Sequence, residues 1–482
     1  MTIRYIVSSF LLLATTLLSC QDSVLDTRPQ TAIAEADAYS TSGKLLAQVN
    51  NLYGQVQAPT FYGGRFIIFN EQRADEFGQN DGNAATGSAI WNQNVASTSE
   101  YINNVWSAGY TAINAANILM GRLAGTTLVP DSVARQYVAE AKFVRALSYL
   151  SLVQTYAKPY NLDKNAPGLP LRLTAITTAG NNDLARSSVG DVYGQILNDL
   201  NEAERDLPTS YPTALLNASR AKKSTAIALK TRVYLHQNDF RNVVIEAAKL
   251  VPDAAPYQYT AGTLTHRLES SIATVFGGSY VGPEAIFTIP FANSTTETPP
   301  TQSALAFNYV TQPILFLTTA GISAHPALNT TADARAGLIG TNAAKQKILR
   351  KFTTTTAPFR DYVPVIRYAE VLLNYAEAAA QTGNLALGTS LLRAVRQRAN
   401  PSSVFTPAEI GTKDALLSTI LTERRIELVG EGFRLGDLQR TGQALPAKVG
   451  SIGTAPTVLP TASNYIWPLP SGELSTNRLI GQ

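Results

Sequence analysis

One segment of the chain has the spacing of a paired-helix repeat, and this feature constrains the fold more than any other. In IRYAEVLLNYAEAAAQTGNLALGTSLLRAV, Ala376 lies seven residues before Gly383, and Gly388 lies five residues after it. Small residues at these positions let two helices approach closely around a glycine turn, as they do in a tetratricopeptide repeat. Such a pair buries its apolar face only against neighbouring pairs, so we expect several of them.

Other segments have the 3.6-residue periodicity of amphipathic helices. In residues 106–123, Trp106, Tyr110, Ile113 and Asn117 fall on one helical face. A second pair of helices surrounds Asn238, although it fits the repeat pattern less well. Helices are also expected in residues 44–56, 139–160, 188–207 and 412–440. These patterns predict a mostly α fold in which tetratricopeptide-like repeats form an α-α superhelix; a set of unrelated helix hairpins is the alternative.

The helical pattern lapses between residues 252 and 358, where glycine, proline, threonine and asparagine interrupt it. Within this stretch, EAIFTIPF at residues 284–291 is typical of a strand. The sequence therefore predicts one domain over residues 37–482. Its helical-repeat scaffold covers about 37–250 and 360–445, and a long loop-rich insertion with small β elements covers about 252–358. Residues 60–82 look irregular, with a short strand at 65–69.

Cys20, the only cysteine of the chain, directly follows an apolar run. Residues 5–18 are apolar apart from serine and threonine, which is too short to span a bilayer but fits a secretory signal. The residues LLSC resemble the lipobox of bacterial lipoproteins, in which the cysteine becomes lipidated. We therefore expect a signal peptide at 1–19 and a lipidated leash at 20–36; a plain cleaved signal with a chance cysteine is the alternative.

Five motifs occur in a fixed order after this N-terminal segment: WSAGYTAINAANILM, AEAKFVRALSYLSLVQTYAKPY, IRYAEVLLNYAEAAAQTGN, ERRIELVGEGFRLGDLQR and WPLPSGELSTN. Together they resemble the SusD/RagB family of nutrient-binding outer-membrane lipoproteins. The resemblance implies a helical bundle with tetratricopeptide-like units, a ligand-binding irregular face, and a role as the lid of a SusC-like TonB-dependent transporter. The chain departs from the family at its end, NRLIGQ, and no starch-binding residue carries over.

The most highly charged stretch places Glu423 and Glu427 one helical turn apart, beside arginines. Glycoside hydrolysis needs two carboxylates on opposite sides of a bond, whereas these two point the same way. Nearby arginines also lower the pKa of a carboxyl group, which spoils it as a general acid. A structural arginine–carboxylate network is therefore favoured over a hydrolase. Glu370 and Glu377 are similarly interpreted as polar contacts between helices.

Motifs for metals, nucleotides and nucleic acids are missing from the sequence. His236, His266 and His325 are isolated, and no cofactor is expected. The stretch DEFGQNDGN at 75–83 is rich in oxygen donors and could hold a structural calcium ion, but it lacks the spacing of an EF-hand loop, which favours a polar turn. The net charge is +4 and the lysines and arginines are scattered, so we expect no nucleic-acid partner.

Aromatic residues in the irregular segments are the best ligand-binding candidates. Sugar rings stack their C–H faces on aromatic rings, while amide, carboxylate and guanidinium groups bind their hydroxyls. The alternative is that these rings pack beneath loops. The candidate residues are Tyr62, Arg73, Asp75, Trp91, Asn94, Tyr280, Phe307 and Tyr309.

These observations predict a binding protein and not an enzyme. The expected protein is tethered to the outer membrane by lipid on Cys20, captures an oligosaccharide and delivers it to a SusC-like TonB-dependent transporter. A peptide ligand is the first alternative. A surface glycoside hydrolase and a tetratricopeptide adaptor that binds only proteins are the others.

Overall fold

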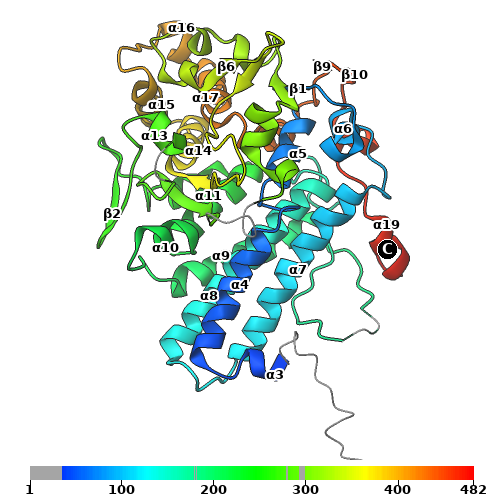
Figure 1. Cartoon of the computed structure of the whole chain (residues 1–482). Helices are drawn as coiled ribbons and strands as arrows, with labels where there is room; N and C mark the ends of the chain where they lie inside the picture. Colours follow the sequence, from blue (N-terminus) through cyan, green and yellow to red (C-terminus); the bar gives the residue numbers. More distant parts are fainter. Residues whose placement is uncertain (1–34, 179, 181, 278–279, 293–298, 482) are drawn as a thin grey trace, which may run out of the picture. The chain divides into compact units, whose positions relative to one another are not determined.

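The computed structural model of the chain describes residues 35–178, 180, 182–277, 280–292 and 299–481 (Figure 1). Cys20, the predicted signal peptide and nearly all of the predicted leash lie outside these ranges. Contacts divide the chain into an N-terminal unit, Met1–Gln48, and a main unit, Val49–Gln482. The first contains α3 (Glu35–Ala38), and α4 (Ser42–Val56) begins in it. None of the helices in the described ranges is long and apolar enough to cross a membrane.

The long helices of the main unit pack against one another in chain order (Figure 1). Each pairs with the next, and Leu235, Val243 and Ala378 form a shared apolar cluster between three of them. This arrangement confirms the predicted mostly α fold with tetratricopeptide-like repeats. The helices are α7 (Glu100–Leu123), α8 (Asp131–Tyr156), α9 (Val189–Asp206), α11 (Lys223–His236), α12 (Phe240–Ala247), α14 (Tyr368–Gln381), α15 (Leu385–Ala399) and α17 (Lys413–Leu428).

The turn between α14 and α15 has the geometry that its small residues predict. Gly383 has a φ of 94°, a left-handed conformation that favours glycine. Asn384 then caps α15 by accepting a hydrogen bond from the amide of Leu387, 3.1 Å away. A Cβ atom on Gly388 would lie 3.0 Å from the carbonyl oxygen of Ala376. A side chain at this position would therefore require the two helices to move apart by a few tenths of an ångström.

We expect Gly388→Val to destabilise the protein by about 1–3 kcal/mol, because its side chain would push α15 away from α14. The matched control is Gly194→Ala in α9, where an added Cβ atom meets no other atom within 4 Å. That change should stabilise the helix by about 0.5–1 kcal/mol. Urea denaturation of the two variants measures both effects. Equal stability of Gly388→Val and the wild type would contradict the close helix contact.

Short strands occur mainly in the region between α12 and α14, as predicted. β4 (Ala285–Ile289) falls within the predicted strand and pairs antiparallel with β8 (Val363–Arg367). A four-stranded antiparallel sheet has the order β1-β5-β7-β6, in which β1 (Phe77–Gln79) comes from the N-terminal part of the main unit. The remaining strands are β2 (Tyr259–Ala261), β3 (Leu264–His266), β5 (Leu315–Leu317), β6 (Ile339–Thr341), β7 (Lys347–Leu349), β9 (Lys448–Gly450) and β10 (Gly453–Ala455).

The strand expected at residues 65–69 is wrong, because this segment begins α5 (Arg65–Arg73). Nearly every side chain of α5 is buried, so the run of aromatic and β-branched residues that resembles a strand is a helix enclosed on most sides. The other short helices are α6 (Ser88–Trp91), α10 (Ala214–Ser219), α13 (Ile272–Gly277), α16 (Pro407–Ile410), α18 (Arg434–Arg440) and α19 (Ser471–Thr476).

Candidate functional site

Most of the aromatic ligand candidates are core residues. Trp91 has an exposed fraction of 0%, and its indole Nε1 donates a hydrogen bond to the carbonyl oxygen of Phe77, 2.8 Å away. Tyr309 is also fully buried. Tyr62 is buried and shares a hydrogen bond of 2.8 Å with the hydroxyl of Ser151. The expected surface platform at Trp91 is therefore wrong: Trp91 and Tyr309 are fully enclosed, and Tyr62 faces only the small internal cavity described below.

The polar candidates and Phe307 do not gather around a common surface. Arg73 is buried and donates to the carbonyl oxygen of Tyr465, 2.8 Å away. Asp75 accepts two hydrogen bonds from Arg434, at 2.7 and 2.9 Å, so both of its oxygens are occupied. Asn94 is exposed, and the half-buried Phe307 meets Phe359 edge-on. Neither of these two residues lines the pocket described below.

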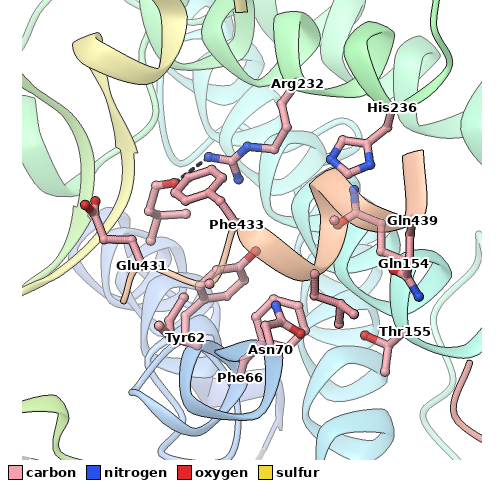
Figure 2. A pocket seen from close by; sticks show the side chains of 15 residues that line it. Tyr62, Phe66, Asn70, Gln154, Thr155, Arg232, His236, Glu431, Phe433 and Gln439 are labelled. Carbon is pink, nitrogen blue, oxygen red and sulfur yellow. Dashed lines mark hydrogen bonds between the residues drawn. The ribbon is translucent and has the colours of Figure 1, made fainter. Parts of the chain in front are cut away.

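A small polar cavity lies in the middle of the scaffold (Figure 2). In Figure 2, Arg232 and His236 of α11 lie on one side of it, and Tyr62, Phe66 and Asn70 lie on the other. Burial lowers the pKa of His236 to about 3, so its ring is neutral. The cavity volume of about 50 Å³ is enough for about three to five water molecules but not for a sugar ring. This cavity is therefore not the site of an oligosaccharide.

A much larger pocket of about 840 Å³ opens beside the β4–β8 pair. Its volume lies within the range of about 300–1,000 Å³ that is typical of ligand sites. β4 and β8 are antiparallel, with Ile289 opposite Val363, and this pairing brings the residues after β4 next to those before β8. The lining residues include Tyr280, Val281, Phe291, Arg360, Tyr362 and the four threonines at 353–356.

Two stacked tyrosines form one wall of this pocket. The rings of Tyr280 and Tyr362 lie 5.1 Å apart, centroid to centroid, at an interplanar angle of 21°. Both side chains are only partly buried, so part of the ring surface is accessible. Burial raises the pKa of Tyr280, and the neighbouring carboxylate of Asp361 raises it further. Both tyrosines are therefore neutral at physiological pH and present uncharged aromatic faces.

The carboxylate of Asp361 joins the tyrosine wall to the threonine wall. It accepts hydrogen bonds from the hydroxyl of Tyr280 and from the backbone amide of Thr353, the latter at 3.1 Å. The amide and hydroxyl of Thr354 also donate to it, at 3.0 and 3.1 Å. Because one buried side chain fixes both walls, the pocket is preorganised for a ligand. Asp361 positions the walls and does not itself line the pocket.

Of the eight predicted ligand residues, only Tyr280 lines this pocket. The sequence analysis did not single out Tyr362, Asp361, Arg360 or the threonines at 353–356. A run of four threonines followed by an aromatic residue and charged residues is a polar segment next to a strand, and this is the signal that could have identified them.

We expect Asp361→Asn to loosen the tyrosine wall and to weaken ligand binding several-fold, because an amide nitrogen would face hydrogen-bond donors that are now paired. Tyr280→Phe removes the same contact from the other side and keeps the ring. The two changes should therefore be non-additive in the binding free energy when they are combined. Calorimetric titration of both single variants and the double variant measures this. Additive losses would contradict the positioning role of Asp361.

Glu423 and Glu427 lie in the predicted network of arginines and carboxylates. Both are fully buried, and Arg335 contacts them at 2.6 and 3.3 Å. Burial raises the pKa of Glu427, but the guanidinium groups of Arg398 and Arg367 outweigh this and hold the pKa well below its usual value. A carboxyl group with so low a pKa is ionised at neutral pH and cannot serve as the general acid of a glycosidase.

Glu370 and Glu377 contact other helices, as predicted. Arg232 binds Glu370 at 2.6 and 2.7 Å, and Arg440 binds Glu377 at the same two distances. Within the described ranges, no group of three or more histidine, cysteine, aspartate or glutamate side chains could hold a metal ion. In the stretch 75–83, Asp75 binds Arg434, and Asn83 caps a short helical turn by accepting from the amide of Ala85. The predicted polar turn is wrong for Phe77–Gln79, which form the buried strand β1, while the residues that follow β1 are irregular.

Comparisons with known proteins agree with this architecture. The sequence model of the SusD family matches residues 345–482, and a model described as starch-binding and associating with the outer membrane matches residues 25–235. SusD-like protein P2 of Formosa agariphila is 24% identical, over 97% of this chain and 97% of its own length. A SusD superfamily protein from Bacteroides fragilis is 31% identical, with a TM-score of 0.83 over 92% of this chain and 100% of that chain.

A laminarin-binding SusD-like protein also shares the fold, with a TM-score of 0.72 at 22% identity, over 91% of this chain and 98% of that chain. Helical repeats with a loop-rich insertion are the architecture that this chain shares with these proteins. The chain belongs to the SusD/RagB family.

Proposed function

We propose that this protein is an outer-membrane surface lipoprotein that binds a nutrient oligosaccharide and delivers it to a SusC-like TonB-dependent transporter. The ligand binds in the pocket of Tyr280 and Tyr362, lipid on Cys20 tethers the chain, and the protein is not an enzyme. The observation that carries the proposal is the stacked tyrosine pair beside a wall of threonine hydroxyls. It offers an aromatic face to sugar C–H groups and hydrogen-bond partners to sugar hydroxyls.

Three further observations support the proposal. A pocket of about 840 Å³ holds several sugar units rather than one. The matching family model is described as starch-binding and associating with the outer membrane, and a similar fold occurs in a laminarin-binding protein. The carboxylates that would be needed for hydrolysis are buried in ion pairs and do not line the pocket.

The test is a binding screen of the full chain against laminarin, starch oligosaccharides and other glycans, with oligopeptides in parallel. We expect saturable binding of a glycan, and at least a tenfold loss of affinity in Tyr362→Ala, because the stacking surface is removed. The matched control is Tyr259→Ala: this half-buried tyrosine of β2 does not line the pocket. Its affinity should equal that of the wild type.

Binding of peptides but of no glycan would overturn the ligand class, and release of shorter sugars by the purified protein would overturn its non-enzymatic role. Equal losses in Tyr362→Ala and Tyr259→Ala would remove the pocket from the proposal. Co-purification of the wild type with a TonB-dependent barrel from outer membranes tests the partner.

A further inference from the structure

A second recess, of about 410 Å³, lies along α7 and shares no lining residue with the pocket of Tyr280 and Tyr362. Its floor is the α7 face that carries Trp106, Tyr110, Ile113 and Asn117, which the sequence marks as a helical stripe. The recess is also lined by Arg172, Ile176 and Asn182, which follow α8, and by Glu473 of α19. The recess is thus within the size range of ligand sites.

The walls of this recess are held in place before any ligand arrives. The side-chain amide of Asn114 exchanges two hydrogen bonds of 2.8 Å with the backbone of Ile176. The amide nitrogen of Asn117 donates to the carbonyl oxygen of Arg172, 2.9 Å away. These bonds fix Arg172 and Ile176 against α7, so a ligand would not have to order these two residues on binding.

Aromatic and charged groups face the recess together. The rings of Trp106 and Tyr110 lie 4.8 Å apart, and Tyr110 is partly exposed. Arg172 and Glu473 form an ion pair of 3.6 Å, which is longer than the 2.7–2.9 Å of a charge-assisted hydrogen bond. Both side chains are partly exposed, at 18% and 15%. Glu473 also accepts hydrogen bonds from Trp106 and Asn477, and Arg172 also donates to the carbonyl oxygen of Asn182, so both charged side chains are held in place at the recess.

Two exposed hydroxyl side chains, Ser107 and Thr111, stand one turn apart on the same helix and also line the recess. We propose that the recess is a second saccharide subsite, which binds one or two sugar units of the same class of polymer as the pocket of Tyr280 and Tyr362. The choice of a saccharide as the ligand rests on the proposed function. The existence of the site is inferred independently, from the recess along α7. Two sites on one chain raise the affinity for a polymer more than that for a short fragment.

The test fills the recess with a long side chain and leaves its walls intact. Thr111→Arg places a guanidinium group in the recess, and Asn104→Arg adds the same group at an exposed position of α7 outside it. In the full chain we expect Thr111→Arg to weaken binding of laminarin or of a starch polymer about tenfold. Binding of the corresponding trisaccharide to the other pocket should not change. Asn104→Arg should match the wild type with both probes.

A second background isolates the recess. In Tyr362→Ala, which weakens the main pocket, some binding of the trisaccharide should persist; adding Thr111→Arg should lower it further, whereas adding Asn104→Arg should not. Complete loss of binding in Tyr362→Ala alone, or equal behaviour of Thr111→Arg and Asn104→Arg, would overturn the second subsite and leave the proposed function standing. A wild type that binds no glycan would overturn the proposed function first and this inference with it.

Discussion

Replacing Glu427 with alanine is expected to destabilise the protein by about 3–5 kcal/mol, because it leaves buried guanidinium groups without their counter-charge. Glu427 has an exposed fraction of 0% and binds Arg398 at 2.5 Å and Arg367 at 3.1 Å. These arginines also contact Glu284 in the segment before β4. The network therefore joins the insertion to α17, and breaking it should destabilise both parts of the fold. Denaturant unfolding of the variant at pH 7 measures the effect.

The control is Arg205→Ala, which breaks an exposed ion pair with Asp206 and should leave stability nearly unchanged, because solvent screens the pair. Equal losses in the two variants would contradict the special role of the buried network.

The same network predicts the direction of the pH dependence. Neighbouring cations depress the carboxyl pKa of Glu427 and Glu431 in the folded state, despite burial, which alone would raise it. A carboxyl group with a depressed folded-state pKa stabilises the fold fully above its unfolded pKa, near 4.5, and this stabilisation is lost as the pH falls towards the folded value. The wild type should therefore lose stability below about pH 4, and Glu427→Gln should lose less over the same interval.

Trp91→Ala is the second large effect, with an expected loss of about 3–5 kcal/mol of stability. The indole fills space between β1 and β9: it donates to the carbonyl oxygen of Phe77, and its ring lies 5.5 Å from the ammonium group of Lys448. Removing it leaves a cavity and an unpaired carbonyl oxygen. We therefore expect Trp91→Ala to lower the melting temperature. If Trp91 were an exposed ligand platform, as the sequence suggested, the melting temperature would hardly change.

Val449→Ala on β9 is the control, since Val449 is 65% exposed and its truncation should change stability by less than about 0.5 kcal/mol. If Trp91→Ala kept wild-type stability but lost its affinity for glycans, the result would contradict the core role of Trp91 and would show that it binds the ligand.

Much of the scaffold could be predicted because its signals are local. Ser188 and Asp191 form a capping box at the start of α9. Gly383, with its positive φ, lies in the turn between α14 and α15. These residues act within a few positions of one another, so the sequence contains the whole interaction. The segment at 65–69 could not be assigned in the same way. Its apolar run fits a strand as well as a helix that is buried on most sides, and only the surrounding packing decides between them.

The binding pocket shows the opposite case. Local patterns in the sequence were enough to predict the helical repeats and the family to which the chain is similar. Tertiary structure alone decided which aromatic rings meet a ligand. Tyr280 and Asp361 are 81 residues apart and meet because β4 pairs with β8, whereas β9 helps to cover Trp91. Whether an aromatic ring is exposed depends on which distant parts of the chain pack over it. Those contacts cannot be predicted from the local spacing of apolar residues.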